Sequence, residues 1–300
     1  MSDAQALPVA RVVAAHGRHA FIEQAGGGRL LCHLRGRKAD IVVGDMVRWQ
    51  PAGDEGVIES VEPRRNLLFR QDEWRTKSFA ANIDQILVLV AGEPMFSESQ
   101  LTRALIAAES AGIDTLIGLN KIDRPAAVQA RERLKPYRAM GLQVLEFALK
   151  AAPQAARAQL EPLLQRRSTL LLGPSGTGKS TLINLLVPQA QAQVGEISQA
   201  LNSGRHTTTS TLWYWLDTGR SGALIDSPGF QEFGLRHIDV AQLASLMPDL
   251  RAHLGACRFY NCMHRHEPGC AVRAAVERGE IAPQRYRLYA EIHDELSRAR

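Results

Sequence analysis

Residues 173–180 read Gly-Pro-Ser-Gly-Thr-Gly-Lys-Ser and match the phosphate-binding pattern G-x-x-x-x-G-K-[ST] at every defined position. An apolar run at 168–172 precedes them and a helical pattern at 179–186 follows, so they join a predicted strand to a predicted helix. There, backbone N–H groups can turn toward phosphate oxygens and the helix amino end favours negative charge. A turn that fits the pattern by chance is the alternative. The expected nucleotide-binding residues are Gly173, Pro174, Ser175, Gly176, Thr177, Gly178, Lys179, Ser180 and Thr181.

Two residues of this loop have expected individual tasks. Lys179 can reach the β and γ phosphates of a nucleoside triphosphate, and it also enters our set of candidate catalytic residues. The Ser180 hydroxyl can ligate Mg²⁺. The loop therefore predicts a nucleotide bound together with Mg²⁺.

Asn120-Lys121-Ile122-Asp123 closes a predicted strand at 115–119. A carboxylate at Asp123 can accept two hydrogen bonds, from guanine N1–H and from the exocyclic amine, whereas adenine offers no such pair. Alone, Asp123 followed by Arg124-Pro125 is also compatible with the start of a helix. Beside a phosphate loop, we expect Asn120, Lys121 and Asp123 to bind guanine, which favours GTP over ATP.

Two further segments supply candidates for the metal and the γ phosphate. Asp226-Ser227-Pro228-Gly229 has the form D-x-x-G, in which Asp226 is linked to Mg²⁺ and the Gly229 N–H senses the γ phosphate. A plain Pro-Gly turn after a strand is the alternative.

The Thr-rich stretch 204–209 precedes that motif, at the place where a switch threonine must reach the metal. We favour Thr208 as the Mg²⁺ ligand and catalytic switch residue, ahead of Thr207 and Thr209. A Thr-rich entry into a strand is the alternative.

Three of the four cysteines lie within 14 residues, together with a histidine. The spacing C-x4-C-x-H-x5-C offers three thiolates and one imidazole, which is the donor set of a closed structural Zn²⁺ site. The expected ligands are Cys257, Cys262, His264 and Cys270. The spacing is not the commoner C-x2-C knuckle, so scattered buried cysteines are the alternative. Cys32 stands apart and is expected in an apolar core.

These candidates need a scaffold, and the chain from 83 to 238 alternates strands and helices. Such alternation predicts a mostly parallel sheet covered by helices on both faces. The predicted strands are 85–91, 115–119, 143–147, 168–172, 211–216 and 222–225, and the predicted helices are 98–111, 126–140, 155–164 and 179–186.

The order of the motifs is unusual because residues 120–123 precede the phosphate loop by about 50 residues. A circular permutation explains the order, since a sheet can be cut and rejoined at exposed loops without changing the site. The D-x-x-G segment then leads directly into the carboxy-terminal part of the chain. Nucleotide state could thus be transmitted to whatever that part binds.

Residues 1–65 alternate short apolar runs with Gly-rich turns and give five predicted strands, which fit a small barrel of the OB type. A generic small barrel with an unrelated role is the alternative. Residues 66–82 are polar and basic and are interpreted as a linker, and residues 239–300 as a helical zinc-binding domain. We therefore predict a multidomain protein with a β-barrel, a central α/β domain and a helical tail.

Composition narrows the class of protein. The chain has 300 residues, of which 45% are hydrophobic and 22% charged, as in a globular protein. No apolar run approaches the roughly 20 residues of a membrane span, and residues 1–17 lack the pattern of a secretory signal. We expect a cytoplasmic, monomeric protein that does not engage membranes.

The charge surplus of five lies entirely in the flanks: residues 1–80 carry 12 Lys and Arg against 10 Asp and Glu, and residues 251–300 carry 9 against 6. Such flanks suit contact with a polyanion such as RNA. Ordinary Arg-rich usage is the alternative.

Taken together, these features resemble the small-ribosomal-subunit-dependent GTPase A family of bacteria. The resemblance covers essentially the whole chain. It rests on the barrel, then the stretches NKID, GPSGTGKSTLINLL, VGEIS, GRHTTT and DSPGFQEFGL, and finally the Cys/His spacing, in that order. It implies an OB barrel, a permuted GTPase domain and a zinc domain that grip the small ribosomal subunit and its rRNA late in maturation, with GTP hydrolysis to GDP promoting release.

The resemblance also bears on individual residues. Phe230 follows D-x-x-G where many GTPases place a water-orienting Gln, and an apolar ring cannot orient water by hydrogen bonding. The family pattern suggests His206 as the catalytic residue that orients or deprotonates the water; a histidine that contacts RNA or solvent is the alternative. A guanine-contacting motif that usually contains Ser-Ala reads Ala148-Leu149-Lys150 here.

Two other classes of function stay open at this point. A kinase or ATPase that uses ATP can share the phosphate loop. A nucleic-acid-binding module can carry a vestigial nucleotide site.

Overall fold

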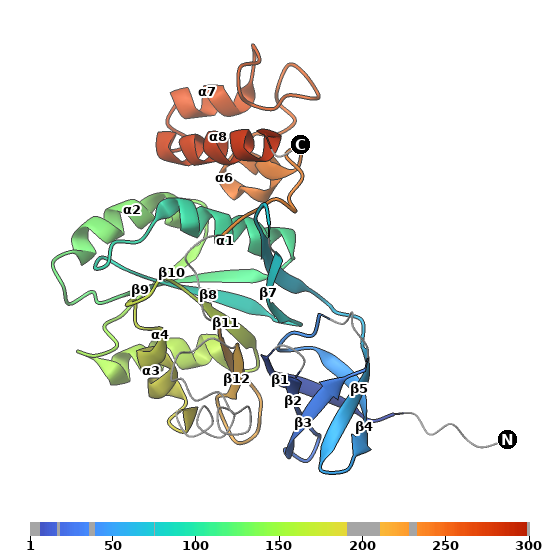
Figure 1. Cartoon of the computed structure of the whole chain (residues 1–300). Coiled ribbons are helices and arrows are strands. Elements are labelled where there is room, and N and C mark those ends of the chain that lie inside the picture. The colour runs from blue at the N-terminus through green and yellow to red at the C-terminus, as the bar shows by residue number, and fades with distance from the viewer. Residues whose placement is uncertain are drawn as a thin grey trace.

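The computed structural model describes residues 7–16, 19–35, 40–74, 76–190, 211–227 and 233–298. Along the chain it shows an amino-terminal barrel, a central sheet with helices on both faces, and a carboxy-terminal helical module (Figure 1). No helix among these residues is both long and apolar enough to cross a membrane.

Five strands form the barrel, as predicted. They are β1 (Val9–His16), β2 (His19–Glu23), β3 (Arg29–Leu34), β4 (Met46–Ala52) and β5 (Glu55–Val61). Their order is β1-β2-β3-β5-β4, and β4 returns to pair with β1, which closes the barrel. Apolar side chains from all five strands fill the interior, and the predicted core residue Cys32 is among them with no exposed surface.

The segment 66–82, which we interpreted as a linker, contains a hairpin instead. Strands β6 (Leu67–Gln71) and β7 (Thr76–Ala81) pair antiparallel as a separate two-stranded sheet. Leu68 and Phe79 are buried in the core that also includes one face of the central sheet. The mostly polar residues 71–74 and 76–77 lie around the turn, so they hid the strand pattern on either side. The hairpin thus packs against the central sheet and is not an extended linker between two domains.

The central sheet has five parallel strands in the order β10-β9-β8-β11-β13, and β12 is antiparallel at its end. Their bounds are β8 (Gln85–Ala91), β9 (Asp114–Asn120), β10 (Gln143–Glu146), β11 (Ser168–Leu172), β12 (Leu212–Trp215) and β13 (Ala223–Asp226). Each strand lies within two residues of its predicted bounds. Helices cover both faces of this sheet, as the alternation of strands and helices in the sequence predicts.

Four helices cover the two faces of the sheet. They are α1 (Glu98–Ser110), α2 (Ala127–Ala139), α3 (Pro153–Leu164) and α4 (Lys179–Leu186). Helices α1 and α2 lie on one face, and α3 and α4 on the other (Figure 1). Two separate apolar clusters correspond to these faces, one including side chains of α1 and α2 and one including those of α3 and α4. The sheet is therefore buried on both sides, which accounts for its nearly continuous apolar strands.

The barrel joins the central sheet through a strand pair. Ala14 of β1 pairs with Leu212 of β12. Beside this pair the Trp215 Nε1–H donates to the Glu23 carboxylate at 2.6 Å, and the Arg11 guanidinium lies 4.5 Å from the centre of the Trp213 ring. The barrel is thus attached to β12, the antiparallel strand at the end of the central sheet.

The carboxy-terminal module docks onto α1 and α2 through a buried arginine. It consists of the short helices η1 (Leu243–Leu246) and α6 (Pro248–Arg251), then α7 (Ala271–Glu277) and α8 (Pro283–Arg298). The Arg285 guanidinium donates to both oxygens of Asp249, at 2.8 and 3.2 Å, and to the Thr102 hydroxyl of α1 at 2.6 Å. It also lies 5.1 Å from the centre of the Tyr137 ring of α2.

We predict that Arg285→Ala destabilises the protein strongly. The side chains of Arg285 and Asp249 are only 3% and 8% exposed, so removal of the arginine leaves a buried carboxylate without its cation. Breaking such a pair costs about 3–5 kcal/mol. Urea unfolding measures the change. Arg278→Ala is the control, because Arg278 pairs with Glu280 on the exposed surface of the same module. Equal unfolding midpoints for the two variants would contradict the stabilising role of the buried Arg285–Asp249 pair.

Candidate functional site

A cavity of about 610 Å³ opens at the carboxyl ends of the parallel strands. Nine of the predicted nucleotide-binding residues line it: Asn120, Lys121, Asp123, Ser175, Gly176, Gly178, Lys179, Ser180 and Thr181. The two motifs are 50 residues apart in the chain, and they meet because β8 pairs with both β9 and β11. Loops that follow parallel strands share one edge of the sheet, where open α/β sheets bind ligands. The cavity has the size of a small-molecule site.

Two glycines of the phosphate loop are required by their surroundings. Gly173 and Gly178 have φ angles of 148° and 109°, which L side chains rarely adopt. A Cβ atom at Gly173 would lie 2.3 Å from the Leu89 carbonyl oxygen, and one at Gly178 would lie 2.4 Å from Asn120 Nδ2. The loop therefore packs directly on β8 and on the end of β9, and Gly178 is also the N-cap residue of helix α4.

Lys179 lies across the loop that it follows. Its ammonium donates to the carbonyl oxygens of Gly173 at 2.6 Å and Pro174 at 3.0 Å. Burial lowers the pKa of this ammonium, and the charge of Asp226 opposes the shift. The positively charged Lys179 ammonium is thus held against the backbone of the phosphate loop, beside the cavity.

Asp226 occupies the end of β13, beside Leu171 of β11 in the parallel register. Burial raises the pKa of its carboxyl group, and the nearby Lys179 opposes that shift. The adjacent Ser227 is 2% exposed, and its Oγ has no hydrogen-bond partner among the described residues. This edge suits a bound cation and phosphate, because Asp226 offers a carboxylate and the Ser227 hydroxyl retains free hydrogen-bonding capacity.

Asn120 connects three loops of the site. It is 4% exposed, its Nδ2 donates to the Thr177 carbonyl at 2.8 Å, and its Oδ1 accepts from the Leu149 N–H at 3.0 Å. Both ends of its amide therefore bond within the protein, one to the phosphate loop and one to the loop after β10. Sequence reasoning included Asn120 among the nucleotide contacts and did not foresee this bridge.

Lys121 and Asp123 line the same cavity as the phosphate loop. The Lys121 ammonium donates to the Glu93 carbonyl at 2.7 Å, and its backbone has a φ of 62°. Asp123 lines the cavity with a carboxylate that is 40% exposed, and the Arg124 guanidinium lies 3.5 Å away. The carboxylate is therefore accessible to a ligand with two adjacent N–H donors.

Glu93 lines the cavity without having been singled out from the sequence, whereas residues 148–150 were noted as the place of a guanine-contacting motif. Glu93 contributes a backbone carbonyl, so its residue type carries no signal. Leu149 and Lys150 line the cavity within the stretch that departs from the Ser-Ala pattern. The backbone of Leu149 is held by Asn120, so this loop keeps its position without the serine.

Other predicted residues cannot be placed. His206, Thr207, Thr208 and Thr209 lie outside the described residues, as do Gly229 and Phe230.

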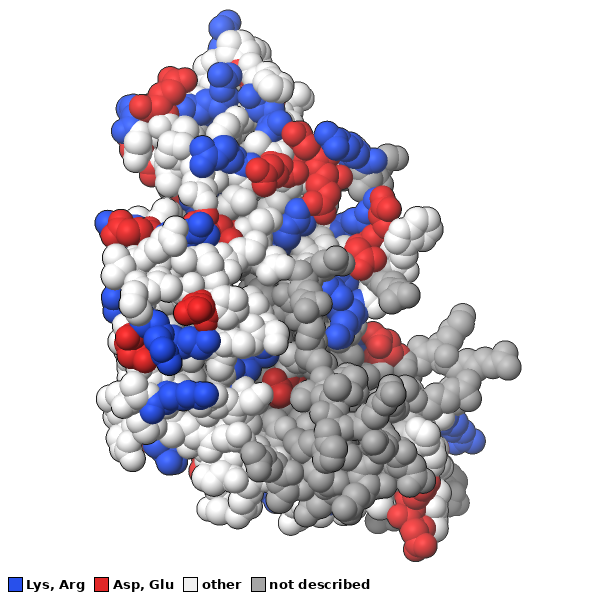
Figure 2. Space-filling view, turned by 60° about the vertical axis from the view of Figure 1, so that its left-hand side comes forward, with Lys and Arg blue, Asp and Glu red and all other residues white. Residues whose placement is uncertain are grey.

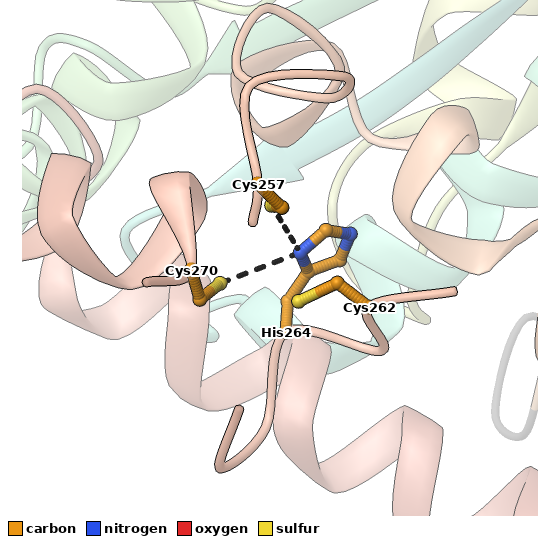
Figure 3. A group of neighbouring side chains, drawn as sticks. All are labelled: Cys257, Cys262, His264 and Cys270. Carbon is orange, nitrogen blue, oxygen red and sulfur yellow. Dashed lines mark hydrogen bonds between the residues drawn. The ribbon is translucent and has the colours of Figure 1, made fainter. Parts of the chain in front are cut away.

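The four predicted metal ligands meet in the carboxy-terminal module (Figure 3). The ligand atoms of Cys257, Cys262, His264 and Cys270 all lie within 4.8 Å of one another. His264 Nδ1 is 3.5 Å from Cys257 Sγ and 3.4 Å from Cys270 Sγ. Three thiol groups and one imidazole form a closed donor set that suits a structural Zn²⁺.

Surrounding groups hold these four residues in place. Backbone N–H groups of Ala271 and Arg273 point at the sulfur atoms of Cys257 and Cys270, at 3.3 and 3.5 Å. The Tyr286 hydroxyl donates to the His264 carbonyl at 2.7 Å. Such contacts orient ligands before the metal binds.

Comparison with known proteins relates the whole chain to one family. The RsgA GTPase family model matches residues 61–236. Proteins named small ribosomal subunit biogenesis GTPase RsgA are 58% identical in Variovorax paradoxus, over 100% of this chain and 96% of the relative, and 56% identical in Burkholderia pseudomallei strain K96243, over 96% and 92%.

Two solved structures have the same architecture. YjeQ from Thermotoga maritima superposes with a TM-score of 0.73 and 29% identity, over 96% of this chain and 98% of that one. YloQ, described as a circularly permuted GTPase, gives a TM-score of 0.71 and 26% identity, over 100% and 98%. These likenesses confirm the predicted order of barrel, permuted GTPase fold and carboxy-terminal module.

We predict that Asn120→Ala weakens nucleotide binding by about tenfold or more. The change removes two buried hydrogen bonds and leaves the Leu149 N–H without its acceptor, which costs about 1–3 kcal/mol. Titration with a fluorescent guanine nucleotide measures the dissociation constant. Asn66→Ala is the control, because its amide also makes two hydrogen bonds, both to the backbone of Ile83, and neither residue lines the cavity. Unchanged affinity in Asn120→Ala would show that the bridge does not organise the site.

Proposed function

Because this chain belongs to the RsgA GTPase family and is a GTP hydrolase, we propose that its hydrolysis of GTP serves the late maturation of the small ribosomal subunit. The observation that carries this proposal is the full-length likeness to relatives named for that process, which includes the barrel and the carboxy-terminal module. The subunit would stimulate hydrolysis, and hydrolysis would aid release of the protein.

The proposed reaction is attack of water on the γ phosphoryl group of GTP. A bond forms between the water oxygen and phosphorus while the bond to the β–γ bridging oxygen breaks, which gives GDP and phosphate. Backbone N–H groups of the phosphate loop and the Lys179 ammonium stabilise the charge on the phosphoryl oxygens. Mg²⁺ would be held by Ser180 and Thr208, with Asp226 linked to it, and would neutralise charge between the β and γ phosphates.

Two further assignments concern specificity and the attacking water. Asp123 accepts from the two adjacent N–H donors of guanine, which supports GTP over ATP and disfavours a kinase or ATPase. His206 orients the water, since Phe230 replaces the Gln of many GTPases. The Gly229 N–H completes the γ-phosphate contact.

We further propose that the partner is the rRNA-rich small subunit, contacted by the barrel (1–65) and by the carboxy-terminal zinc-binding domain (239–300) on either side of the GTPase domain (83–238). The charge surplus in both flanks supports contact with a polyanion. The protein would act as a cytoplasmic monomer.

The four-ligand cluster is proposed to hold one structural Zn²⁺ per chain. The donor set and the proximity of the four ligand atoms support this identity. With four protein ligands there is no open position for catalysis, so the ion would stabilise the module.

We predict that small ribosomal subunits raise the rate of GTP hydrolysis by the wild-type protein severalfold or more. Phosphate release is measured with and without subunits for wild type, Lys179→Ala and His206→Ala. Lys179→Ala should lose hydrolysis because it removes the cation at the phosphates. His206→Ala should lose the stimulated rate while it still binds nucleotide.

The controls separate the alternatives. Lys135→Ala removes an exposed lysine of α2 that pairs with Glu132 and should behave as wild type. A rate that subunits leave unchanged would defeat the ribosomal proposal. Lys179→Ala with normal turnover would instead favour a binding module with a vestigial nucleotide site.

We predict about one Zn²⁺ per chain in purified protein and a lower melting temperature after chelation. Metal analysis and thermal unfolding measure both. Cys262→Ser should lose the ion, because it removes one of four ligands, whereas Cys32→Ser should retain it because Cys32 lies in the barrel core. Wild-type protein without bound metal would refute the zinc site.

A further inference from the structure

An aromatic pair is exposed at the tip of a loop in the carboxy-terminal module. Large apolar side chains are rarely left in water, and among the described residues only Val9, Trp74, Val128, Phe259 and Tyr260 are so exposed. Phe259 and Tyr260 are consecutive in the sequence, and Tyr260 is 103% exposed. Adjacent exposed rings indicate a contact surface.

The loop that carries the pair is held at both ends. Cys257 and Cys262 of the metal cluster flank residues 258–261, all of which are exposed. The Arg258 N–H donates to the Gly269 carbonyl at 3.0 Å, and the Cys262 N–H donates to the Phe259 carbonyl at 3.3 Å. The rings are therefore presented on a short, closed loop, which lowers the entropy lost when a ligand orders them.

Charge around the tip favours an anionic partner. The Arg258 guanidinium lies 5.5 Å from the centre of the Phe259 ring, and it has no ion pair within the described parts of the chain. The nearby acids are already engaged: Glu267 accepts from the N–H groups of Met263, Arg265 and His266, and Asp294 pairs with Arg265. Basic side chains, with acidic ones between them, lie over the upper end of the module (Figure 2).

We propose that Phe259 and Tyr260 stack on an unpaired RNA base while Arg258 contacts the adjacent phosphate. Aromatic rings beside an arginine are the means by which proteins bind single-stranded nucleic acid. A protein partner fits less well, since the exposed apolar surface of this loop is confined to the two rings, and the flanking Arg258 and Asn261 are polar and exposed. This inference rests on the proposed function and names the contact that the module makes with the subunit.

The test measures binding of the zinc-loaded, full-length protein to small ribosomal subunits by sedimentation in the presence of a non-hydrolysable GTP analogue. Tyr260→Ala should weaken binding about fivefold or more, the loss expected for one stacked base. Tyr260→Phe should restore wild-type binding because it keeps the ring. Tyr260→Leu should remain weak because it keeps apolar area without a π face.

Two controls exclude indirect effects. Val128→Ala removes an exposed apolar side chain from α2 and should bind as wild type. Zinc content and GTP hydrolysis without subunits should be unchanged in every variant of residue 260, since the side chain touches neither site.

Photo-crosslinking identifies the partner. Tyr260→benzoylphenylalanine in the subunit complex should crosslink to rRNA, and crosslinks to ribosomal protein alone would overturn the proposal. Equal binding of wild type, Tyr260→Ala and Tyr260→Leu would overturn it as well and leave the ribosomal function intact. Wild-type protein that binds no subunits would remove the proposed function and this inference together.

Discussion

The parallel pairing of β8 with both β9 and β11 is the constraint on which the site depends. It brings the ends of β9 and β11 to the same edge, so that Asp123 and Lys179 line one cavity. Asn120 then fixes the spacing across that edge through its bonds to Thr177 and Leu149. Without this pairing, the phosphate loop and the Asn-Lys-Ile-Asp stretch would not line a common pocket.

The permuted chain order connects the edge of the sheet to the rest of the molecule. Directly after the D-x-x-G segment, Leu235 bridges to Gln71 at the end of β6, and the Phe233 ring stacks on Phe79 of β7 at 5.5 Å. The chain then enters the carboxy-terminal module, which Arg285 anchors to Thr102 of α1. On its other side, β12 pairs with β1 of the barrel. The barrel thus attaches to β12 at the end of the central sheet, and the carboxy-terminal module attaches to α1.

The sequence predicted the strands and helices well where apolar periodicity and glycine turns coincide, as in β8, β11 and α4. The hairpin at 67–81 was missed because its polar turn outweighed two short apolar strands in the composition of the segment. The roles of Asn120 and Arg285 were not foreseen either, because each depends on partners at least 29 residues away that only the fold brings together. The Cys/His cluster was predictable since its four members are close in sequence and chemically distinctive.

Calorimetric titration of the protein with GDP and with ADP, both in the presence of Mg²⁺, tests most directly whether one pocket unites guanine selection with phosphate binding. We predict one GDP bound per chain and binding of ADP at least about 100-fold weaker, because adenine offers the Asp123 carboxylate no pair of adjacent N–H donors. Equal affinity for the two nucleotides, or binding of GDP that Asp123→Asn leaves unchanged, would contradict the account.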